Sequence, residues 1–244
     1  GEIMLIKTGI DRLDELLKDG LPAVTNTLLY APPFIGKETI LKSFALTGLQ
    51  EGEPAIFVLT DTSFAEMKEE MQKMDAHFAR YEDEGKVKYI DVYSKGVELR
   101  EEGPNVIFVD SPINRERITA SIIKTEKEFQ QKYERHRLVF DSISTLIVYA
   151  DAKAVFRFLQ VVSGTCKRLG ATSLFSMTRG MHEEIEVQTI KHLMDGVIEM
   201  REEASRMQIR VQGCGEVVSR NWIDYLLEKD EIRLTGAFRM SRVA

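Results

Sequence analysis

Residues 31–38 read Ala31-Pro32-Pro33-Phe34-Ile35-Gly36-Lys37-Glu38. The apolar run Thr27-Leu28-Leu29-Tyr30 precedes them, and a segment with helical periodicity follows from Thr39. A Gly-Lys pair between a strand and a helix is typical of a phosphate-binding loop, whose backbone N–H groups and lysine hold nucleotide phosphates. We therefore predict a nucleotide site formed by Pro33, Phe34, Ile35, Gly36, Lys37, Glu38 and Thr39.

One position of this loop departs from the usual pattern. A Ser or Thr normally follows the lysine and binds Mg²⁺, whereas this chain has Glu38. A carboxylate about 4 Å from a phosphate oxygen repels it by roughly 4 kcal/mol at an effective dielectric constant of about 20, which weakens binding about a thousandfold. Glu38 could instead pair with Lys37, or bind Mg²⁺ directly as a metal ligand. The sequence leaves these three alternatives open.

Composition and charge narrow the class of protein. The chain has 244 residues, of which 43% are hydrophobic and 30% charged, so we expect one compact α/β domain over residues 1–244. No apolar run approaches the roughly 20 residues of a membrane helix, and the first residues do not resemble a signal peptide, so we expect a cytoplasmic protein. The net charge of −6 lacks the basic excess expected of a dedicated nucleic-acid binder, so we do not expect nucleic acid as a partner.

The pattern of short β-rich runs and helical segments predicts an α/β fold with a mostly parallel central sheet flanked by helices. Six strands are expected at 26–30, 55–59, 87–93, 105–110, 138–141 and 172–178. Helices are expected at 39–50, 64–74, 115–134 and 152–168. Four short antiparallel strands, at 197–200, 208–211, 222–227 and 232–234, are expected to follow.

Two aspartates stand where predicted strands end. Asp141 closes the apolar run Leu138-Val139-Phe140, a position from which nucleotide-binding folds orient Mg²⁺ beside the terminal phosphate, so Asp141 is a candidate metal ligand. Asp61 follows the next strand of the same edge and is a candidate base that aligns an attacking water. Each has a simpler alternative, because aspartates, and the Thr62-Ser63 pair, also cap helices and turns.

Other polar residues carry weaker signals. The four histidines, His77, His136, His182 and His192, lack the spacing of a metal site and are expected at the surface or in hydrogen bonds. Residues 178–192 are expected to form a polar loop, in which Met181 marks a contact surface.

Several ordered segments together resemble the KaiC-like branch of the RecA superfamily of P-loop ATPases. The similar segments are residues 8–17 with Gly20-Leu21-Pro22, the loop at 31–38, and residues 86–91, 139–144 and 195–198. The resemblance implies a RecA-like P-loop fold with the strand at 26–30 in a central position and the late antiparallel strands extending the sheet. It also implies ATP and Mg²⁺ as cofactors, contact of Thr39 with the α-phosphate, and often a ring with nucleotide at the subunit boundary.

This chain differs from the family pattern mainly at positions that the resemblance links to Mg²⁺ binding and ATP hydrolysis. The loop begins with Ala31 and carries Glu38 after the lysine, which makes the Walker A motif degenerate. Relatives have two adjacent carboxylates where this chain has Asp61 and then Thr62. Their late Lys-x-Arg segment, which reaches a neighbouring subunit's phosphates, is similar to Arg210-Val211-Gln212, so only the first cation is kept. Loss of such an arginine lowers turnover by roughly 10³.

Three functions are therefore compatible with the sequence. The favoured one is an ATP-binding regulatory or assembly module with weak or absent hydrolysis, acting with copies of itself or with a protein partner. A recombinase-like accessory acting on DNA is disfavoured, because residues 179–188 are acidic where phosphate contacts would be expected. The third is a nucleotide-free pseudo-ATPase scaffold.

Overall fold

A ten-stranded sheet forms the centre of the molecule in the computed structural model, which describes residues 2–238. Its strands lie in the order β12-β11-β10-β9-β3-β8-β7-β4-β5-β6. Seven of them are mutually parallel, and six of these seven are β3 (Asn26–Ala31), β8 (Ala171–Thr178), β7 (His136–Asp141), β4 (Ala55–Leu59), β5 (Val87–Asp91) and β6 (Val106–Phe108). The strand before the phosphate-binding loop, β3, is thus central, as predicted.

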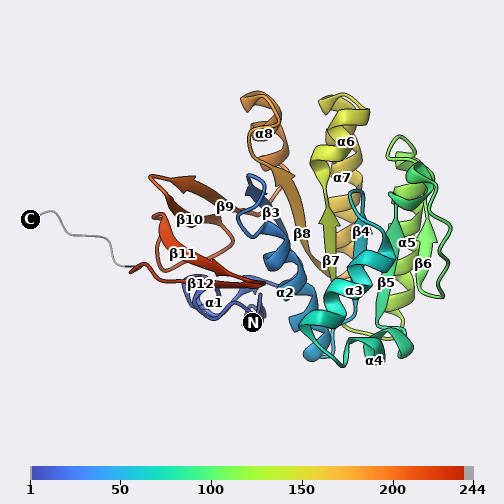
Figure 1. Ribbon diagram of the computed structural model, residues 1–244, viewed down its shortest axis with the longest axis horizontal. Coiled ribbons are helices and arrows are strands. Elements are labelled where there is room, and N and C mark those ends of the chain that lie inside the picture. Colours follow the sequence, from blue (N-terminus) through green and yellow to red (C-terminus); the bar gives the residue numbers. More distant parts are fainter. Residues whose placement is uncertain (1, 239–244) are drawn as a thin grey trace, which may run out of the picture.

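The late strands extend this sheet and curl away from it (Figure 1). The strand β9 (Gly196–Glu203) runs parallel to β3, and antiparallel pairs then add β10 (Arg206–Gly213), β11 (Ile223–Glu228) and β12 (Glu231–Leu234). A separate two-stranded ribbon joins β1 (Leu5–Ile6) to β2 (Leu21–Pro22). The predicted α/β fold with antiparallel strands at its C-terminal end is confirmed.

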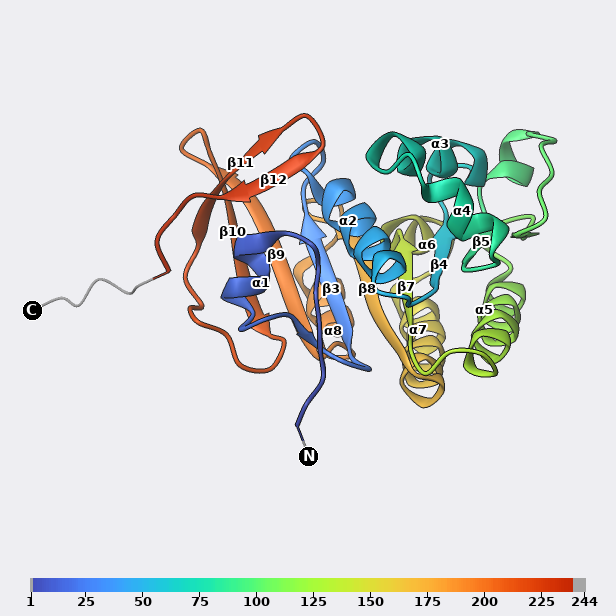
Figure 2. The ribbon, with the colours of Figure 1, turned by 90° about the horizontal axis from the view of Figure 1, so that it is seen from below.

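Helices cover both faces of the sheet (Figure 2). One face carries α1 (Asp11–Leu16), α2 (Lys37–Gln50), α3 (Phe64–Met74) and α4 (Phe78–Asp83). The other face carries α5 (Arg115–Gln130), α6 (Ile143–Tyr149), α7 (Ala152–Leu169) and α8 (Glu184–Lys191). A short 3₁₀ helix, η1 (Ser94–Val97), follows β5. Two layers of helices therefore enclose the parallel strands, which are apolar on both sides.

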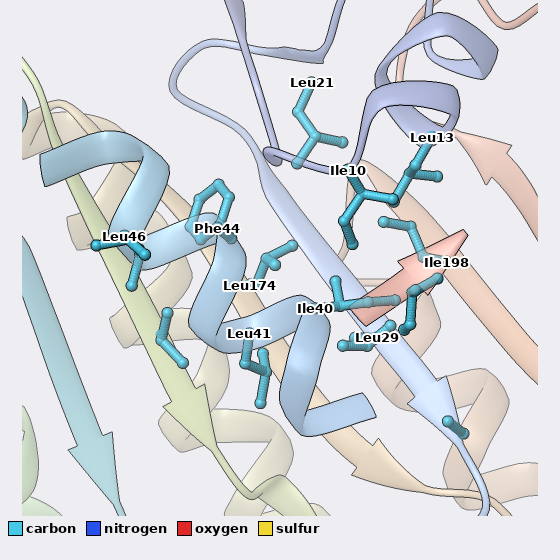
Figure 3. Close-up of a cluster of buried hydrophobic side chains, with 14 of the residues drawn as sticks. Ile10, Leu13, Leu21, Leu29, Ile40, Leu41, Phe44, Leu46, Leu174 and Ile198 are labelled. Atoms are coloured by element: carbon cyan, nitrogen blue, oxygen red, sulfur yellow. The ribbon is translucent and has the colours of Figure 1, made fainter. Parts of the chain in front are cut away.

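The core has one half on each side of the sheet. Along β4, Phe57 belongs to the cluster under α2 and α3, whereas Val58 belongs to the cluster under α5 and α7. Figure 3 shows α2 entering the first cluster, where Ile40 lies beside the strand residue Leu29. This packing fixes the direction of α2 and hence the position of the loop at its N-terminus.

Several predicted boundaries were wrong by a few residues. The strand predicted to reach residue 93 ends at Asp91, because the Asp91 carboxylate accepts hydrogen bonds from the backbone of Ser94 and Phe64 and turns the chain. The helix predicted to reach residue 134 ends at Gln130, since the chain must leave it to enter β7 at His136. The predicted loop at 178–192 instead contains α8, whose Val187 and Ile190 are buried against the molecule.

Candidate nucleotide-binding site

The loop at residues 31–36 joins the end of β3 to the start of α2. Gly36 stands immediately before α2 with φ 106°, a backbone angle that favours glycine. A Cβ atom there would lie 2.9 Å from Ile232 Cδ1, so glycine also lets the loop approach β12 closely. Phe34 has φ 71° as well, and its side chain is 93% exposed. The loop therefore bends as its motif predicts, although a phenylalanine occupies one of its left-handed positions.

The β11–β12 hairpin holds the loop from the side. The Tyr225 hydroxyl donates a 2.6 Å hydrogen bond to the Ile35 carbonyl oxygen, and the Ile35 side chain is buried. Burial raises the pKa of the Tyr225 hydroxyl, which keeps it protonated and able to donate. The C-terminal strands thus position the phosphate-binding loop.

Lys37 is buried at the first turn of α2. Its ammonium group donates a 3.4 Å hydrogen bond to Thr178 Oγ1 at the end of β8. Among residues 2–238, no ion pair joins Lys37 to Glu38, so the Lys37 ammonium group is not neutralised by the adjacent carboxylate. Of the three alternatives left open by the sequence, pairing of Glu38 with Lys37 is not found in this structure.

A cavity of about 210 Å³ lies between Lys37 and the carboxyl ends of β4 and β7. Five carboxylates line it together with that single ammonium group: Glu38, Asp61, Glu66, Glu70 and Asp141. The predicted catalytic and metal-binding residues are therefore brought together, in a strongly acidic setting. A polyphosphate entering this cavity would be repelled unless a divalent cation or protons offset the carboxylates.

Asp141 lies deepest among these carboxylates. Burial, together with the neighbouring Asp61, raises the pKa of Asp141 to about 6, while Lys37 opposes the shift. Ser176 Oγ on β8 donates a 2.9 Å hydrogen bond to Asp141 Oδ1. The other carboxylate oxygen is thus available to a ligand.

Asp61 is held at the mouth of the cavity. It accepts hydrogen bonds from the hydroxyls of Thr145 on α6 and of Thr60. The Thr62 hydroxyl donates a 2.7 Å hydrogen bond to the Glu66 carboxylate on α3. Ser63 caps α3 by accepting a hydrogen bond from the Glu66 amide, so the capping interpretation is correct for Ser63, whereas Asp61 lines the cavity.

A second cavity, of about 410 Å³, lies on the other side of the first turn of α2. Thr39 and Ser43 line it, together with residues 9–12 and the β11–β12 hairpin. Thr39 and Glu38 therefore face different cavities, as the 100° rotation between successive helical residues predicts. The phosphate-binding loop thus has the acidic cavity on one side and room for a larger group on the other.

Arg210 lies on β10 and is occupied within its own chain. Its guanidinium group is 3.4 Å from the buried Glu199 carboxylate and stacks over the Trp222 ring, 4.6 Å from the centroid. Arg179 and Lys191 contact the same carboxylate. Arg210 does not line the acidic cavity of its own chain.

Comparison with known proteins agrees with this geometry. The family model described as the KaiC ATPase matches residues 6–217. The chain belongs to the KaiC ATPase family. A UPF0273 protein of Thermotoga maritima is 30% identical over 203 residues, covering 81% of this chain and 80% of the relative. One of Pyrococcus furiosus is 29% identical over 199 residues, covering 80% and 77%.

The fold is shared with a solved member of this group. A KaiC-like protein from the hyperthermophilic archaeon Pyrococcus horikoshii superposes with a TM-score of 0.73 at 20% identity. The match covers 96% of this chain and 100% of the other. KaiC membership supports an ATP-binding module. Among the helices described over residues 2–238, none combines the length and the apolar character needed to cross a membrane.

The KaiC family implies that Mg²⁺ binds together with the nucleotide. Whether this site suits the metal depends on the carboxylates that line the cavity. Within residues 2–238, no group of three or more acidic, histidine or cysteine side chains converges closely enough to hold a metal ion. Among residues 2–238, only one Asp141 carboxylate oxygen has a side-chain donor, and Glu38 lines the same cavity. These residues could supply one or two ligands, so the phosphate oxygens would have to complete the coordination.

The sequence did not reveal the hydroxyl groups that support this KaiC-type site. Thr178 binds Lys37, Ser176 binds Asp141 and Thr145 binds Asp61. His182, expected to be a surface or hydrogen-bonded residue, has a buried ring whose Nε2 atom lies 2.7 Å from Ser144 Oγ. Their only sequence signal is a position at or shortly after the carboxyl end of a strand, and the pairing of β7 with β8 brings these strand ends to one edge of the sheet.

Proposed function

We propose that this protein is an ATP-binding regulatory or assembly module that hydrolyses ATP slowly or not at all. The single observation that carries the proposal is the cavity beside Lys37, which keeps the phosphate-binding lysine and Asp141 but places Glu38 where a hydroxyl would hold Mg²⁺. Nucleotide binding follows from the lysine and the loop, and slow turnover follows from the altered metal position.

Two further features support slow turnover. The family resemblance implies two adjacent carboxylates at positions 61 and 62. This chain has only Asp61, because position 62 is a threonine whose hydroxyl binds Glu66 on α3. Arg210 is engaged by Glu199 and Trp222, and Gln212 replaces the second cation. A cation that must leave an ion pair before reaching a neighbour's phosphates is a poor stabiliser of the transition state.

Calorimetric titration of the purified protein with ATP, with and without Mg²⁺, tests the proposal. We expect saturable binding at submillimolar to millimolar ATP, lost in Lys37→Ala and kept in Lys73→Ala, which removes an exposed lysine on α3. Absence of binding at millimolar ATP would favour the nucleotide-free scaffold. Turnover at ordinary rates of about 1–100 per second, abolished by Lys37→Ala, would refute slow hydrolysis.

A further inference from the structure

A chain of hydrogen bonds leads from Lys37 to a buried histidine outside the acidic cavity. The Lys37 ammonium group donates to Thr178 Oγ1 at 3.4 Å. The backbone N–H of Thr178 donates to Ser144 Oγ at 2.8 Å, and the same oxygen lies 2.7 Å from His182 Nε2. These bonds connect α2, the end of β8, the first turn of α6 and the residues before α8.

The far part of this chain is shielded from water. Ser144 is 2% exposed, and the His182 side chain is 4% exposed. Hydrogen bonds between buried groups are costly to break, because a donor or acceptor that loses its partner there cannot turn to solvent. The bonds of Ser144 with Thr178 and His182 therefore hold the end of β8 in one place.

The protonation of His182 suits this arrangement. Burial lowers the pKa of His182, while Glu186, whose carboxylate lies 3.7 Å from Nδ1, opposes the shift. A neutral ring with its proton on Nδ1, on the side of Glu186, leaves Nε2 as an acceptor for the Ser144 hydroxyl. Ser144 Oγ then donates to His182 and accepts from Thr178, so the hydroxyl bonds to both neighbours at once.

The end of β8 is also joined to the phosphate-binding loop. Thr178 lies opposite Ala31, the last residue of β3, and the Arg179 amide donates a 2.9 Å hydrogen bond to the Ala31 carbonyl oxygen. Residues 178 and 179 thus contact both the start of the loop, at Ala31, and the lysine that follows it, Lys37. A displacement of this strand end would therefore disturb the whole loop.

We propose that His182 is a positioning residue of the nucleotide site, which fixes Ser144 and through it the strand end that holds Lys37. His182 does not line the cavity beside Lys37, so it acts on a nucleotide only through other residues. A lysine that is already held in place loses less conformational freedom when it binds phosphate, which strengthens binding. This role rests on the proposed binding of ATP.

Titration calorimetry with ATP and Mg²⁺ tests the role with matched variants. We expect His182→Phe and Ser144→Ala each to weaken ATP binding about fivefold, the cost of ordering one long side chain on binding. His182→Gln should bind ATP as the wild type does, because its side-chain amide can replace Nε2 as the partner of Ser144. His192→Phe makes the same change at an exposed histidine at the C-terminal end of α8 and should leave affinity unchanged.

The double variant Ser144→Ala/His182→Phe distinguishes one chain of bonds from two separate defects. Because both residues act through the same chain, the double variant should bind ATP no more weakly than Ser144→Ala alone. Losses of affinity that add up in the double variant, or a His182→Gln variant as weak as His182→Phe, would overturn the positioning role.

Nuclear magnetic resonance of the histidine rings provides a readout that a purely stabilising role would not move. In the wild type, ATP should shift the ring nitrogen signals of His182 and leave those of His192 in place, and Ser144→Ala should abolish the His182 shift. Wild-type protein that binds no ATP would overturn both this role and the proposed function. Unchanged ATP affinity in both His182→Phe and Ser144→Ala would overturn the positioning role alone.

Discussion

Glu38 stands on the first turn of α2 and faces the acidic cavity beside Asp61 and Asp141. Because Glu38 is exposed, water screens much of its repulsion toward phosphate. We therefore expect Glu38→Thr to strengthen Mg²⁺-dependent ATP binding by about tenfold, less than the thousandfold estimated without screening. Titration calorimetry at fixed Mg²⁺ measures the change.

Glu69→Thr is the matched control for this prediction. It removes the same charge from an exposed position of α3 outside the cavity and should change affinity little. Weaker binding in Glu38→Thr would instead identify Glu38 as a ligand of Mg²⁺.

Asp141 makes the stability of the protein depend on pH. Its pKa rises from 3.8 to about 6 on folding, so the folded state binds more protons between these values and becomes less stable as pH rises through this interval. Asp141→Asn removes this effect. We expect the variant to be more stable than wild type above pH 6, by at most about 3 kcal/mol, and to match it below about pH 4.

Urea denaturation without nucleotide, followed from about pH 4 to pH 8, measures this difference. Ser176 donates to one Asp141 oxygen, and a hydroxyl can also donate to the amide oxygen of asparagine. A variant that is equally destabilised at every pH would show a packing defect in place of the expected ionisation effect.

At the scale of elements, the β11–β12 hairpin serves as a brace for the phosphate-binding loop. Removing the hydroxyl in Tyr225→Phe leaves the Ile35 carbonyl oxygen without its 2.6 Å donor in a buried place. We expect a loss of about 1–3 kcal/mol in the free energy of unfolding and weaker ATP binding, because the loop is less well positioned. Urea denaturation and calorimetry on the same preparation measure both effects.

Tyr133→Phe, which removes a half-buried hydroxyl elsewhere, provides the control for Tyr225→Phe and should change neither quantity appreciably. Normal ATP affinity in a destabilised Tyr225→Phe would show that the hairpin stabilises the fold without positioning the loop.

Two of the helices missed by sequence reasoning, α6 and α8, have a common physical cause. The helix α6 contains the run Leu146-Ile147-Val148-Tyr149, whose β-branched and aromatic residues favour a strand. It is nevertheless helical, because Ser142 caps its N-terminus and Leu146 packs in the core. In α8 only Val187 and Ile190 are buried, which is too few for a clear period. Tertiary packing overrides local preference in both helices.

At the scale of the whole molecule, Arg137 ties distant segments together from the start of β7. Its guanidinium group is fully buried, 3.0 Å from Glu53, and donates to the carbonyl oxygens of Lys7 and Phe44. A Cβ atom at position 48 would lie 2.4 Å from the Arg137 side chain, so Gly48 makes room for it.

Replacing this group should destabilise the whole fold. In Arg137→Met the Glu53 carboxylate loses its buried partner, and we expect unfolding to become easier by about 3–5 kcal/mol in urea denaturation. Lys73→Met breaks an exposed ion pair with Glu69 and should change stability by less than about 1 kcal/mol. Equal effects of the two changes would contradict the structural role of Arg137.

The sequence by itself determined the family, the strand, loop and helix around Lys37, and the aspartates at the ends of two neighbouring strands. These are local properties: a strand, a Gly-Lys turn and a helix are encoded by adjacent residues, and strand ends meet at one edge of a parallel sheet. The tertiary structure alone decided that Lys37 binds Thr178, that Arg210 is held by Glu199, and that five carboxylates share one cavity. Such contacts join residues far apart in the chain, and their distances depend on the packing of the sheet and its helices, which no local pattern specifies.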